Sequence, residues 1–354
     1  MDQKIPLGLS YDDVLLIPRR SNISSRTDID LSTQITPRVR LKIPLISINM
    51  TDVTGVEMAI AMAKAGGLGL LPRFITAEEE ADMVNKVKKA GVLSAAAVGC
   101  RNGALSRAEM LVKAGVDILT LDVAHAHMER ALEVTRELKQ KFGSSVDIIS
   151  GVVATKEGAE DLFRAGADSV RVGVGPGTIC ITRLVTGVGV PQITAVGWAA
   201  DAARRWKRTV LCDGGAKNSG DIVKALAAGA SAVVAGSLYA GTDEAPGEKI
   251  EKDGKTYKVY NASTSLTEKK NHIKHMGEVL PPNYSKQIEG TESIVPYKGP
   301  VSGVIENLTS GIRSGLSYCG AKNIPEFWKK AKFIQVTSNG VKENGVHDVI
   351  TTKI

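Results

Sequence analysis

The pattern of hydrophobic and polar positions repeats along the chain. Five times, a stretch with apolar residues at helical spacing ends in alanine and glycine, and a short run rich in Val, Ile, Leu and Ala follows. The five copies read KAGGLGLL from Lys64, KAGVLSAAAVG from Lys89, KAGVDILTLDV from Lys113, RAGADSVRVGV from Arg164 and AAGASAVVAGS from Ala227. Glycine is favoured just after a helix end, and an unbroken apolar run is typical of a strand buried on both faces. The repeat therefore predicts a parallel α/β fold.

The same pattern predicts eight strands, at 45–49, 67–71, 93–98, 117–122, 147–150, 168–173, 209–213 and 231–235. Helices are predicted between them, for example at 54–65, 77–90, 105–114, 128–142, 156–165 and 217–228, with Thr54 as the N-cap of the first. Eight parallel strands close naturally into a (β/α)8 barrel, the TIM barrel. An open doubly wound sheet is the alternative. The barrel is favoured because no GxGxxG follows the first strand. In addition, all copies of the repeat have the same order of helix, glycine and apolar strand.

We expect residues 1–354 to form a single barrel domain, since barrels of this kind reach such a length. Residues 1–44 are expected to be extended structure and loops. The segment 246–298 is polar and irregular, and it lies between the eighth strand and a final helix near 301–315. A segment this long is usually functional or disordered, and its position after strand eight places it at the catalytic end of a barrel. We therefore expect an active-site flap, with a solvated surface excursion as the alternative.

Composition narrows the classes of function. The first residues, MDQKIPLGLS, lack a secretory signal pattern, and the longest uncharged run, 225–242, is typical of a strand with turns. A cytoplasmic protein with no membrane span is expected. Four scattered cysteines without CxxC spacing argue against a zinc site or a disulfide framework. The net charge of +7 suits anionic ligands, but no basic block with interleaved aromatic residues indicates nucleic-acid binding.

The main candidate for chemistry is the stretch 170–183, VRVGVGPGTICITR. An apolar run ends at Val174, and a Gly-Pro-Gly turn then presents Cys180 between Thr178 and Thr182. A cysteine on a loop beyond a strand end is placed for chemistry, and Arg183 with the loop dipoles can favour its thiolate. The alternative is a small apolar residue in a turn, because free cysteines are usually buried and inert.

Two glycine-containing turns form a candidate phosphate site. Predicted strand seven ends in LCDGG at 211–215 and strand eight in AGS at 235–237. The backbone N–H groups of Gly214, Gly215 and Gly236 and the hydroxyl of Ser237 can bind a phosphate, which often lies after strands seven and eight of a barrel. Asp213 can accept hydrogen bonds from ribose hydroxyls. Ordinary helix–strand turns are the alternative.

The end of strand four reads LDVAHAH at 121–127. Asp122 is expected to point into the mouth of the barrel and to contact a second ribose. His125 and His127 are two positions apart, which suits a role at a helix N-terminus better than metal ligation. Cys180 is expected to face the phosphate site across the barrel, an arrangement that suits a nucleotide whose base reaches a thiolate. A thiolate adds readily to an electron-poor amidine carbon.

Longer motifs carry a resemblance to a known family. They are SYDDVLLIP, GVGPGTICITR, TGVGVPQITAV at 186–196, DGG, GTDEAPGE from Gly241, VPYKGPV at 295–301 and SGLSYCGAKNI at 314–324. On these motifs the chain resembles the IMP dehydrogenase / GMP reductase family over nearly its full length. The resemblance implies an oxidoreductase of purine nucleotide metabolism, in GMP biosynthesis, built as a TIM barrel and assembled as a homotetramer. The CBS module of many family dehydrogenases is absent, since residues 87–98 continue from the second to the third β/α unit without an insertion.

The resemblance also implies residue roles. Cys180 would be the nucleophile, with Thr182 and Glu289 assisting proton transfer and Tyr284 as a further catalytic candidate. A purine mononucleotide would be bound by Ser47, Met50, Thr178, Asp213, Gly214, Gly215, Gly236, Ser237, Tyr260, Ser263 and Thr264. The cofactor, NAD or NADP, would be bound by Asp122, Ala124, His125 and Gly173. A K⁺ site is implied at Gly175, Gly177 and Cys180, with Glu343 contributed by a neighbouring subunit.

The family carries out two reactions through one cysteine thioimidate at purine C2. In the dehydrogenase, hydride passes to NAD and water hydrolyses the thioimidate to xanthosine monophosphate. In the reductase, ammonia leaves GMP and hydride arrives from NADPH, giving IMP. Only the dehydrogenase must activate water.

Particular residues favour each reaction. The dehydrogenases activate water with an Arg-Tyr pair in the flap, and the nearest candidate here is Asn283-Tyr284. This departure favours the reductase, as do YNASTS at 260–265 in place of YRGMGS, Gly151-Val152 in place of Gly-Asn and the permuted order MTDV from Met50. VPYKGPV, YCGAKNI and the ending GVHDVITTK favour the dehydrogenase.

IMP dehydrogenase is the first interpretation, because the matches outnumber the departures, and GMP reductase is the alternative. A third hypothesis is a purine-nucleotide-binding regulator without turnover. The presence of Cys180, Thr182 and Glu289 argues against it.

Overall fold

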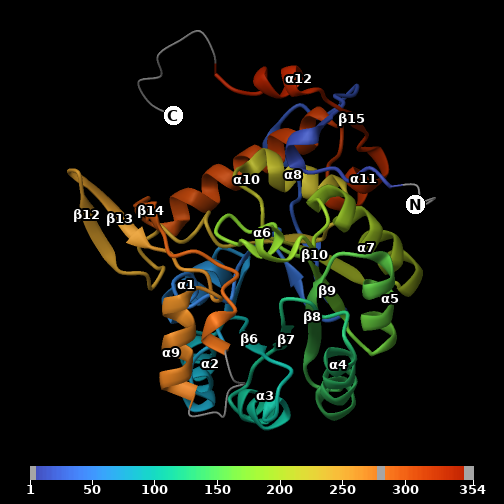
Figure 1. Cartoon of the computed structure of the whole chain (residues 1–354). Helices are drawn as coiled ribbons and strands as arrows, with labels where there is room; N and C mark the ends of the chain where they lie inside the picture. The colour runs from blue at the N-terminus through green and yellow to red at the C-terminus, as the bar shows by residue number, and fades with distance from the viewer. Residues whose placement is uncertain (1–4, 277–283, 347–354) are drawn as a thin grey trace.

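A closed barrel of eight parallel strands forms the centre of the computed structural model, which describes residues 5–276 and 284–346 (Figure 1). The strands follow one another around the barrel in chain order, and the last pairs with the first. They are β4 (Leu45–Ser47), β5 (Leu68–Leu71), β6 (Ala95–Val98), β7 (Ile118–Asp122), β8 (Asp147–Val153), β9 (Ser169–Val172), β10 (Thr209–Asp213) and β11 (Ala232–Ala235). All eight predicted strands are present, and the TIM barrel is confirmed over the open sheet.

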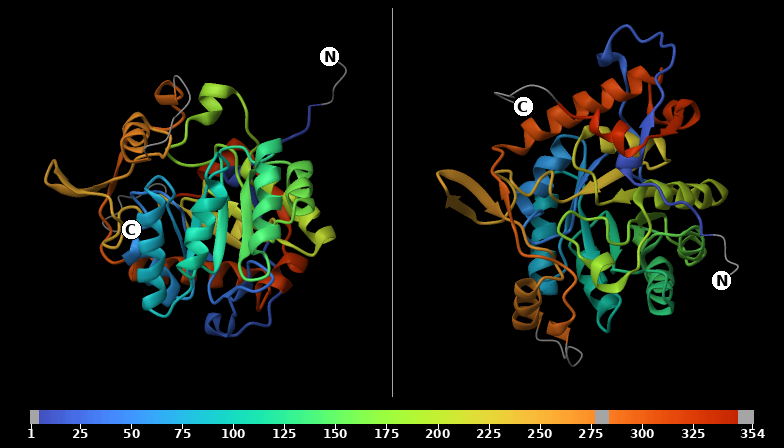
Figure 2. Two further views of the ribbon diagram at one scale, coloured as in Figure 1. Left: turned by 90° about the horizontal axis from the view of Figure 1, so that it is seen from below. Right: turned by 45° about the horizontal axis from the view of Figure 1, so that its top comes forward.

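A ring of helices covers the barrel, as the view from below shows (Figure 2, left). It consists of α1 (Val56–Lys64), α2 (Ala77–Lys89), α3 (Ala104–Lys113), α4 (Glu129–Phe142), α5 (Lys156–Arg164), α7 (Gln192–Trp206), α8 (Ser219–Ala227) and α10 (Val301–Tyr318). Five helices end at the glycines of the sequence repeat, Gly66, Gly91, Gly115, Gly166 and Gly229, and all five have positive φ. These glycines turn the chain back towards the barrel without the steric cost that a Cβ would add.

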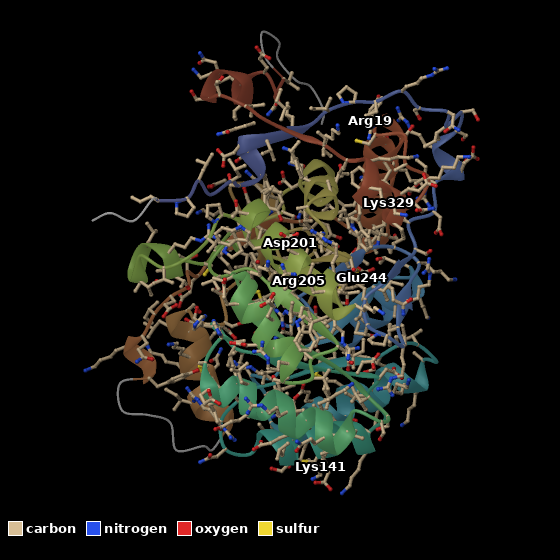
Figure 3. The ribbon with its side chains drawn as sticks, turned by 90° about the vertical axis from the view of Figure 1, so that its right-hand side faces the viewer. Arg19, Lys141, Asp201, Arg205, Glu244 and Lys329 are labelled. Carbon is tan, nitrogen blue, oxygen red and sulfur yellow. The ribbon has the colours of Figure 1, made fainter. Side chains whose placement is uncertain are left out.

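Ion pairs between neighbouring helices line the outside of the ring. Figure 3 shows Asp201 and Arg205 on α7 and Lys141 on α4. Arg205 lies 3.5 Å from Glu160 of α5, and Lys141 lies 3.0 Å from Glu109 of α3. These pairs are exposed or half-buried and contribute little energy each, so the buried apolar faces hold the helices on the barrel.

Residues 33–41 close one end of the barrel. The hairpin of β2 (Thr33–Gln34) and β3 (Arg40–Leu41) packs Ile35, Val39 and Leu41 against the apolar interior of the strands. Asp147, at the start of β8, accepts hydrogen bonds from Thr36 at 2.6 Å and from Arg38 at 2.7 Å. The opposite end, where the strands have their carboxyl termini, is therefore the open one.

The segment 246–298 is more ordered than predicted. It contains β12 (Lys249–Lys252), β13 (Lys255–Val259), α9 (Leu266–Met276), the 3-10 turn η3 (Tyr284–Lys286) and β14 (Ile294–Pro296). Asp253 and Gly254, both with positive φ, form the two-residue turn of the β12–β13 hairpin, a strong sequence signal that the irregular composition hid. The hairpin projects away from the barrel in every view (Figures 1 and 2). Asn283 lies outside the described residues.

The remaining elements are short or terminal. They are η1 (Tyr11–Asp13), η2 (Arg26–Asp28), α6 (Thr182–Thr186), α11 (Ile324–Lys330), α12 (Ser338–Lys342), and the antiparallel pair β1 (Val14–Leu16) and β15 (Phe333–Gln335). Thr54 is not an N-cap: α1 begins after Gly55, and the Thr54 hydroxyl donates to the Ile48 carbonyl at 2.6 Å. Within the described part of the chain, no helix has the length and apolarity that crossing a bilayer requires.

Candidate active site

A cavity of about 540 Å³ opens at the carboxyl ends of the barrel strands. Strand-end loops and the flap line it together. Of the residues predicted for the site, Met50, Asp122, Ala124, Gly173, Gly175, Gly177, Thr178, Cys180, Thr182, Asp213, Gly214, Gly215, Gly236, Ser237, Tyr260, Ser263, Thr264, Tyr284 and Glu289 line this cavity. Sequence positions spread over 240 residues therefore meet in one space, as the ends of barrel strands do.

Three predicted site residues do not line the cavity. Ser47 is fully buried, and its hydroxyl lies within hydrogen-bond distance of the Thr54 hydroxyl, at 2.9 Å. His125 is exposed beyond the end of β7, on the loop that leads into α4. Glu343 is exposed at the end of α12. A cation site shared with Glu343 of another subunit therefore remains a prediction.

Cys180 lies at one end of a short hydrogen-bonded chain. Its thiol donates to the Thr182 hydroxyl at 3.1 Å, and that hydroxyl donates to the Glu289 carboxylate at 2.8 Å. The geometry comes from backbone pairing: Cys180 and Gly290 form an antiparallel bridge, and Ile181 N–H donates to the Glu289 carbonyl at 2.9 Å. The end of the flap is thus fixed against the cysteine loop, and a sulfur, a hydroxyl and a carboxylate are placed in line for proton transfer.

The loop that carries Cys180 is held in shape by Arg183. Its guanidinium donates to the carbonyls of Val174 at 3.0 Å and Val190 at 2.6 Å. Gly175 has φ of +74°, and a side chain there would lie 2.8 Å from Arg183 Cγ, so the turn requires glycine. Arg183 therefore shapes the loop that presents the sulfur.

The two predicted phosphate turns lie beside the cysteine loop. The Thr178 and Ser237 hydroxyls are 3.2 Å apart, and Gly214 packs against Pro176 and Gly177. A side chain at Gly236 would collide with the Tyr260 hydroxyl, so the phenol closes over this turn. Backbone N–H groups, hydroxyls and a phenol converge here, as an anion with an attached sugar requires.

A buried arginine connects the two predicted ribose carboxylates. Arg171 of β9 is 2% exposed and contacts Asp213 at 2.6 Å and Asp122 at 3.1 Å. Asp122 also contacts Arg73 at 3.1 Å. Burial opposes ionisation of Asp122, but Arg171 and Arg73 outweigh it and lower the pKa of this carboxyl. At Asp213 burial dominates and raises the pKa, although Arg171 opposes it. Sequence reasoning missed Arg171, although a charged residue within an apolar run was a usable signal.

Part of the cavity wall is basic. Arg73, Arg101, Arg107 and Lys269 line it, together with His272 and Tyr284. Burial first, and then these four cations, lower the pKa of His272 to about 4, so its imidazole is neutral at pH 7. Arg73 and Arg101 follow the ends of β5 and β6 closely, which was a usable signal that the sequence analysis passed over.

Known proteins are similar to this chain in sequence and in fold. A family model described as the IMP dehydrogenase / GMP reductase domain matches residues 8–347. The chain belongs to the IMP dehydrogenase / GMP reductase family. Members of this family are nicotinamide-dependent oxidoreductases, so the resemblance seen in the motifs is confirmed at the level of the family.

Individual relatives include both enzymes. The chain is 34% identical to inosine-5'-monophosphate dehydrogenase of Nitrosopumilus maritimus, over 97% of this chain and 98% of the relative. It is 32% identical to GMP reductase of Leishmania donovani, over 98% of each. These alignments span 470 and 487 positions, more than the 354 residues of this chain, which is a short form of the family.

A solved structure is similar across the whole fold. A GMP reductase variant from Trypanosoma brucei, in complex with guanosine 5'-monophosphate, has a TM-score of 0.92 and 31% identity. The match covers 98% of this chain and 99% of the other.

Proposed function

We propose that the protein oxidises or reduces a purine mononucleotide at C2 through a thioimidate on Cys180. The observation that carries the proposal is the chain of hydrogen bonds from Cys180 through Thr182 to Glu289. This chain of hydrogen bonds supplies a nucleophile and a proton relay. The glycine turns and Asp213 in the same cavity suit a nucleotide. The complex of the similar Trypanosoma brucei enzyme with guanosine 5'-monophosphate supports the same class of substrate.

The nucleotide would bind with its phosphate at the turns after β10 and β11. Gly214, Gly215 and Gly236 would donate backbone N–H groups, and Ser237 its hydroxyl. Asp213 would accept from the ribose hydroxyls while Arg171 holds its carboxylate. Cys180 and the phosphate turns lie close enough for one mononucleotide to reach both, because Thr178 and Ser237 are in contact.

The residues fit a nicotinamide cofactor beside the base. The cavity that contains Cys180 is also lined by Gly173, Asp122 and Ala124, and His272 Nε2 has no hydrogen-bond partner in the described chain. The cofactor supplies hydride transfer, which the side chains themselves cannot perform. Asp122, ionised between two arginines, would orient it.

In the dehydrogenase direction, Cys180 Sγ would bond to C2 of IMP, and the hydride released from C2 would pass to the nicotinamide cofactor. Water then attacks C2, the C–S bond breaks, and xanthosine monophosphate forms. Thr182 would take the proton from this water and pass it to Glu289. We favour this direction because the signature motifs match the dehydrogenase more often and relatives named IMP dehydrogenase are the more numerous.

GMP reductase is the second candidate, favoured by one feature of the flap. The segment 246–298 contains no arginine, so it lacks the Arg-Tyr pair with which family dehydrogenases activate water. In this direction Glu289 and Thr182 would give a proton to the departing ammonia, the C–S bond would remain until hydride arrives, and IMP would form.

The test is nicotinamide absorbance in two cuvettes, one with IMP and NAD and the other with GMP and NADPH. A rise in the first identifies the dehydrogenase, and a fall in the second identifies the reductase. Cys180→Ala should abolish either change and leave nucleotide affinity nearly intact, whereas Cys319→Ala, at the buried C-cap of α10, should retain both. Full turnover by Cys180→Ala would refute the mechanism. Tight nucleotide binding by the wild-type protein without a trappable Cys180 adduct would instead support the non-catalytic regulator.

Three further features are proposed. The family resemblance supports a homotetramer and a K⁺ site on the carbonyls of the cysteine loop near Gly175 and Gly177, and the sequence pattern supports a location in the cytoplasm. Binding of nucleic acid or of a membrane is not expected.

A further inference from the structure

Two distant motifs of the sequence, MTDV after β4 and YNASTS after β13, meet at the junction between the barrel and the flap. The Asp52 carboxylate, in the loop after β4, accepts a hydrogen bond from the backbone N–H of Asn261 at 2.8 Å. The neighbouring Thr51 hydroxyl donates to the Glu268 carboxylate, on α9, at 2.8 Å. Adjacent residues of one barrel loop therefore hold two separate parts of the flap.

These contacts are polar and partly buried. Glu268 is 8% exposed, and its carboxylate also accepts a hydrogen bond from the Asn271 amide at 3.3 Å. Burial raises the pKa of Asp52 to about 6; the N–H of Asn261 opposes this shift, and the Glu268 carboxylate adds to it. Two carboxylates this close repel each other, so directed hydrogen bonds, and not charge attraction, hold the flap here.

The residue that Asp52 holds comes directly after Tyr260. Tyr260 is buried, and a side chain at Gly236 would collide with its hydroxyl. Burial, followed by the charges of Asp213 and Asp52, raises the pKa of the phenol. The phenol therefore keeps its proton and can donate a hydrogen bond to an anion at this turn.

The other hydrogen bonds around Tyr260 stay within the flap. The Tyr260 N–H donates to the Ser293 carbonyl at 2.8 Å, and the Ser293 N–H donates to the Asn261 side-chain oxygen at 3.3 Å. These bonds hold two strands of the flap together, whereas the bond to Asp52 joins them to the barrel. The place of the phenol relative to the barrel strands therefore depends on the loop after β4.

We propose that Asp52 and Thr51 are positioning residues, which hold the flap so that the Tyr260 phenol stands over the phosphate turn after β11. The proposal rests on the proposed function, which assigns the mononucleotide phosphate to this turn. Among the described residues that line the cavity, neither Asp52 nor Thr51 is present, so both would act through the flap without touching the nucleotide. When the flap is in place for a smaller fraction of the time, nucleotide affinity falls by the same factor.

The test is Asp52→Leu, which removes the acceptor for the Asn261 N–H. Binding of IMP and of GMP is measured by calorimetry, and KM and kcat with the substrate pair that the wild type turns over. We expect both affinities to fall about tenfold and KM to rise equally, the effect of one buried donor left without a partner. The value of kcat should change little, because the backbone bridge between Cys180 and Gly290 holds the catalytic end of the flap separately.

Three further variants separate positioning from a general loss of structure. Asp52→Asn keeps an oxygen that can accept the same hydrogen bond, so it should retain most of the affinity. Thr51→Val should weaken binding by a smaller factor, because Glu268 keeps its hydrogen bond from Asn271. In a Tyr260→Phe background, Asp52→Leu should cause no further loss, because the hydroxyl that it positions is gone.

The matched control is Asp117→Leu at the closed end of the barrel, where the carboxylate accepts a hydrogen bond from the Ser94 N–H at 2.8 Å. The same kind of bond is lost, so this variant should lower the denaturant midpoint and leave affinity and KM unchanged. Wild-type affinity in both Asp52→Leu and Thr51→Val, or additive losses when Asp52→Leu is combined with Tyr260→Phe, would overturn the proposal. Absence of turnover in the wild type would count against the proposed function instead, and calorimetry would still test the flap.

Discussion

At the scale of single residues, Thr182 has the most specific task, because it joins sulfur and carboxylate. Thr182→Val keeps the shape of the side chain and removes the hydroxyl. We expect turnover to fall about 10²- to 10⁴-fold, the range for a lost proton relay, while nucleotide affinity stays the same. Steady-state rates and direct binding measure the two effects. Thr182→Ser retains the hydroxyl and should recover most of the rate, and a Thr182→Val enzyme of normal rate would remove Thr182 from the mechanism.

The buried carboxyl of Glu80 makes the stability of the protein depend on pH. Burial raises the pKa of its carboxyl to about 8, although Arg107 opposes the shift. Between pH 4.5 and 8 the folded state therefore keeps a proton that the unfolded chain has lost, and stability must fall as pH rises through this window. The shift corresponds to about 5 kcal/mol at most. Urea unfolding at pH 5, 6.5 and 8 should show this decline in the wild type and a flatter profile in Glu80→Gln.

At the scale of elements, α10 packs on α8 through two glycines. A side chain at Gly315 would lie 2.6 Å from Val223 Cγ1, and one at Gly311 would collide with Ser219. Gly315→Ala should therefore destabilise the protein by about 1–3 kcal/mol through overpacking. Gly303→Ala, on the same helix with open space around it, should stabilise by about 0.5–1 kcal/mol through helix propensity. Denaturant midpoints compare the two, and equal effects would contradict the packing argument.

Elements were predictable from sequence where local signals repeat. Each helix stop such as Gly115 is followed by a strand buried on both faces, so eight strands and their order could be inferred. The hairpin turn at Asp253 and Gly254 was missed because its strands are polar and lack the apolar alternation that marks most strands. Helix α7 was not assigned in advance; it begins after Pro191 without a side-chain cap.

The parts of the candidate site that lie at the ends of barrel strands could be predicted from the sequence. Cys180, Asp213 and the glycine turns follow directly from their positions after strands. The basic residues Arg101 and Lys269 could not be placed together, because one follows β6 and the other lies on the flap. Their meeting depends on the fold of α9, which no local pattern specifies.

At the scale of the whole molecule, the oligomeric state can be predicted and tested. Leu184, Val185 and Val188 are exposed on and after α6, next to the cysteine loop, and exposed apolar side chains so close together are typical of interfaces. With the family resemblance, they predict a homotetramer with four times the chain mass of 37.5 kDa. Light scattering should report this mass, and a monomer at micromolar concentration would contradict it. Leu184→Glu should weaken assembly, whereas Lys252→Glu on the projecting hairpin should not.

The closure of the barrel between its last and first strands has a consequence for folding during translation. β11 pairs with β4, with Val233 opposite Leu45. The pairing of β4 is therefore completed only after β11 has been synthesised. Until then the apolar edges of β4 and β10 have no partner, and a nascent chain is open to misassociation. A chain interrupted before β11 would carry Cys180 but neither the Gly236 turn nor Glu289. A chain that stops anywhere before residue 289 therefore lacks the carboxylate that ends the Cys180–Thr182–Glu289 chain of hydrogen bonds.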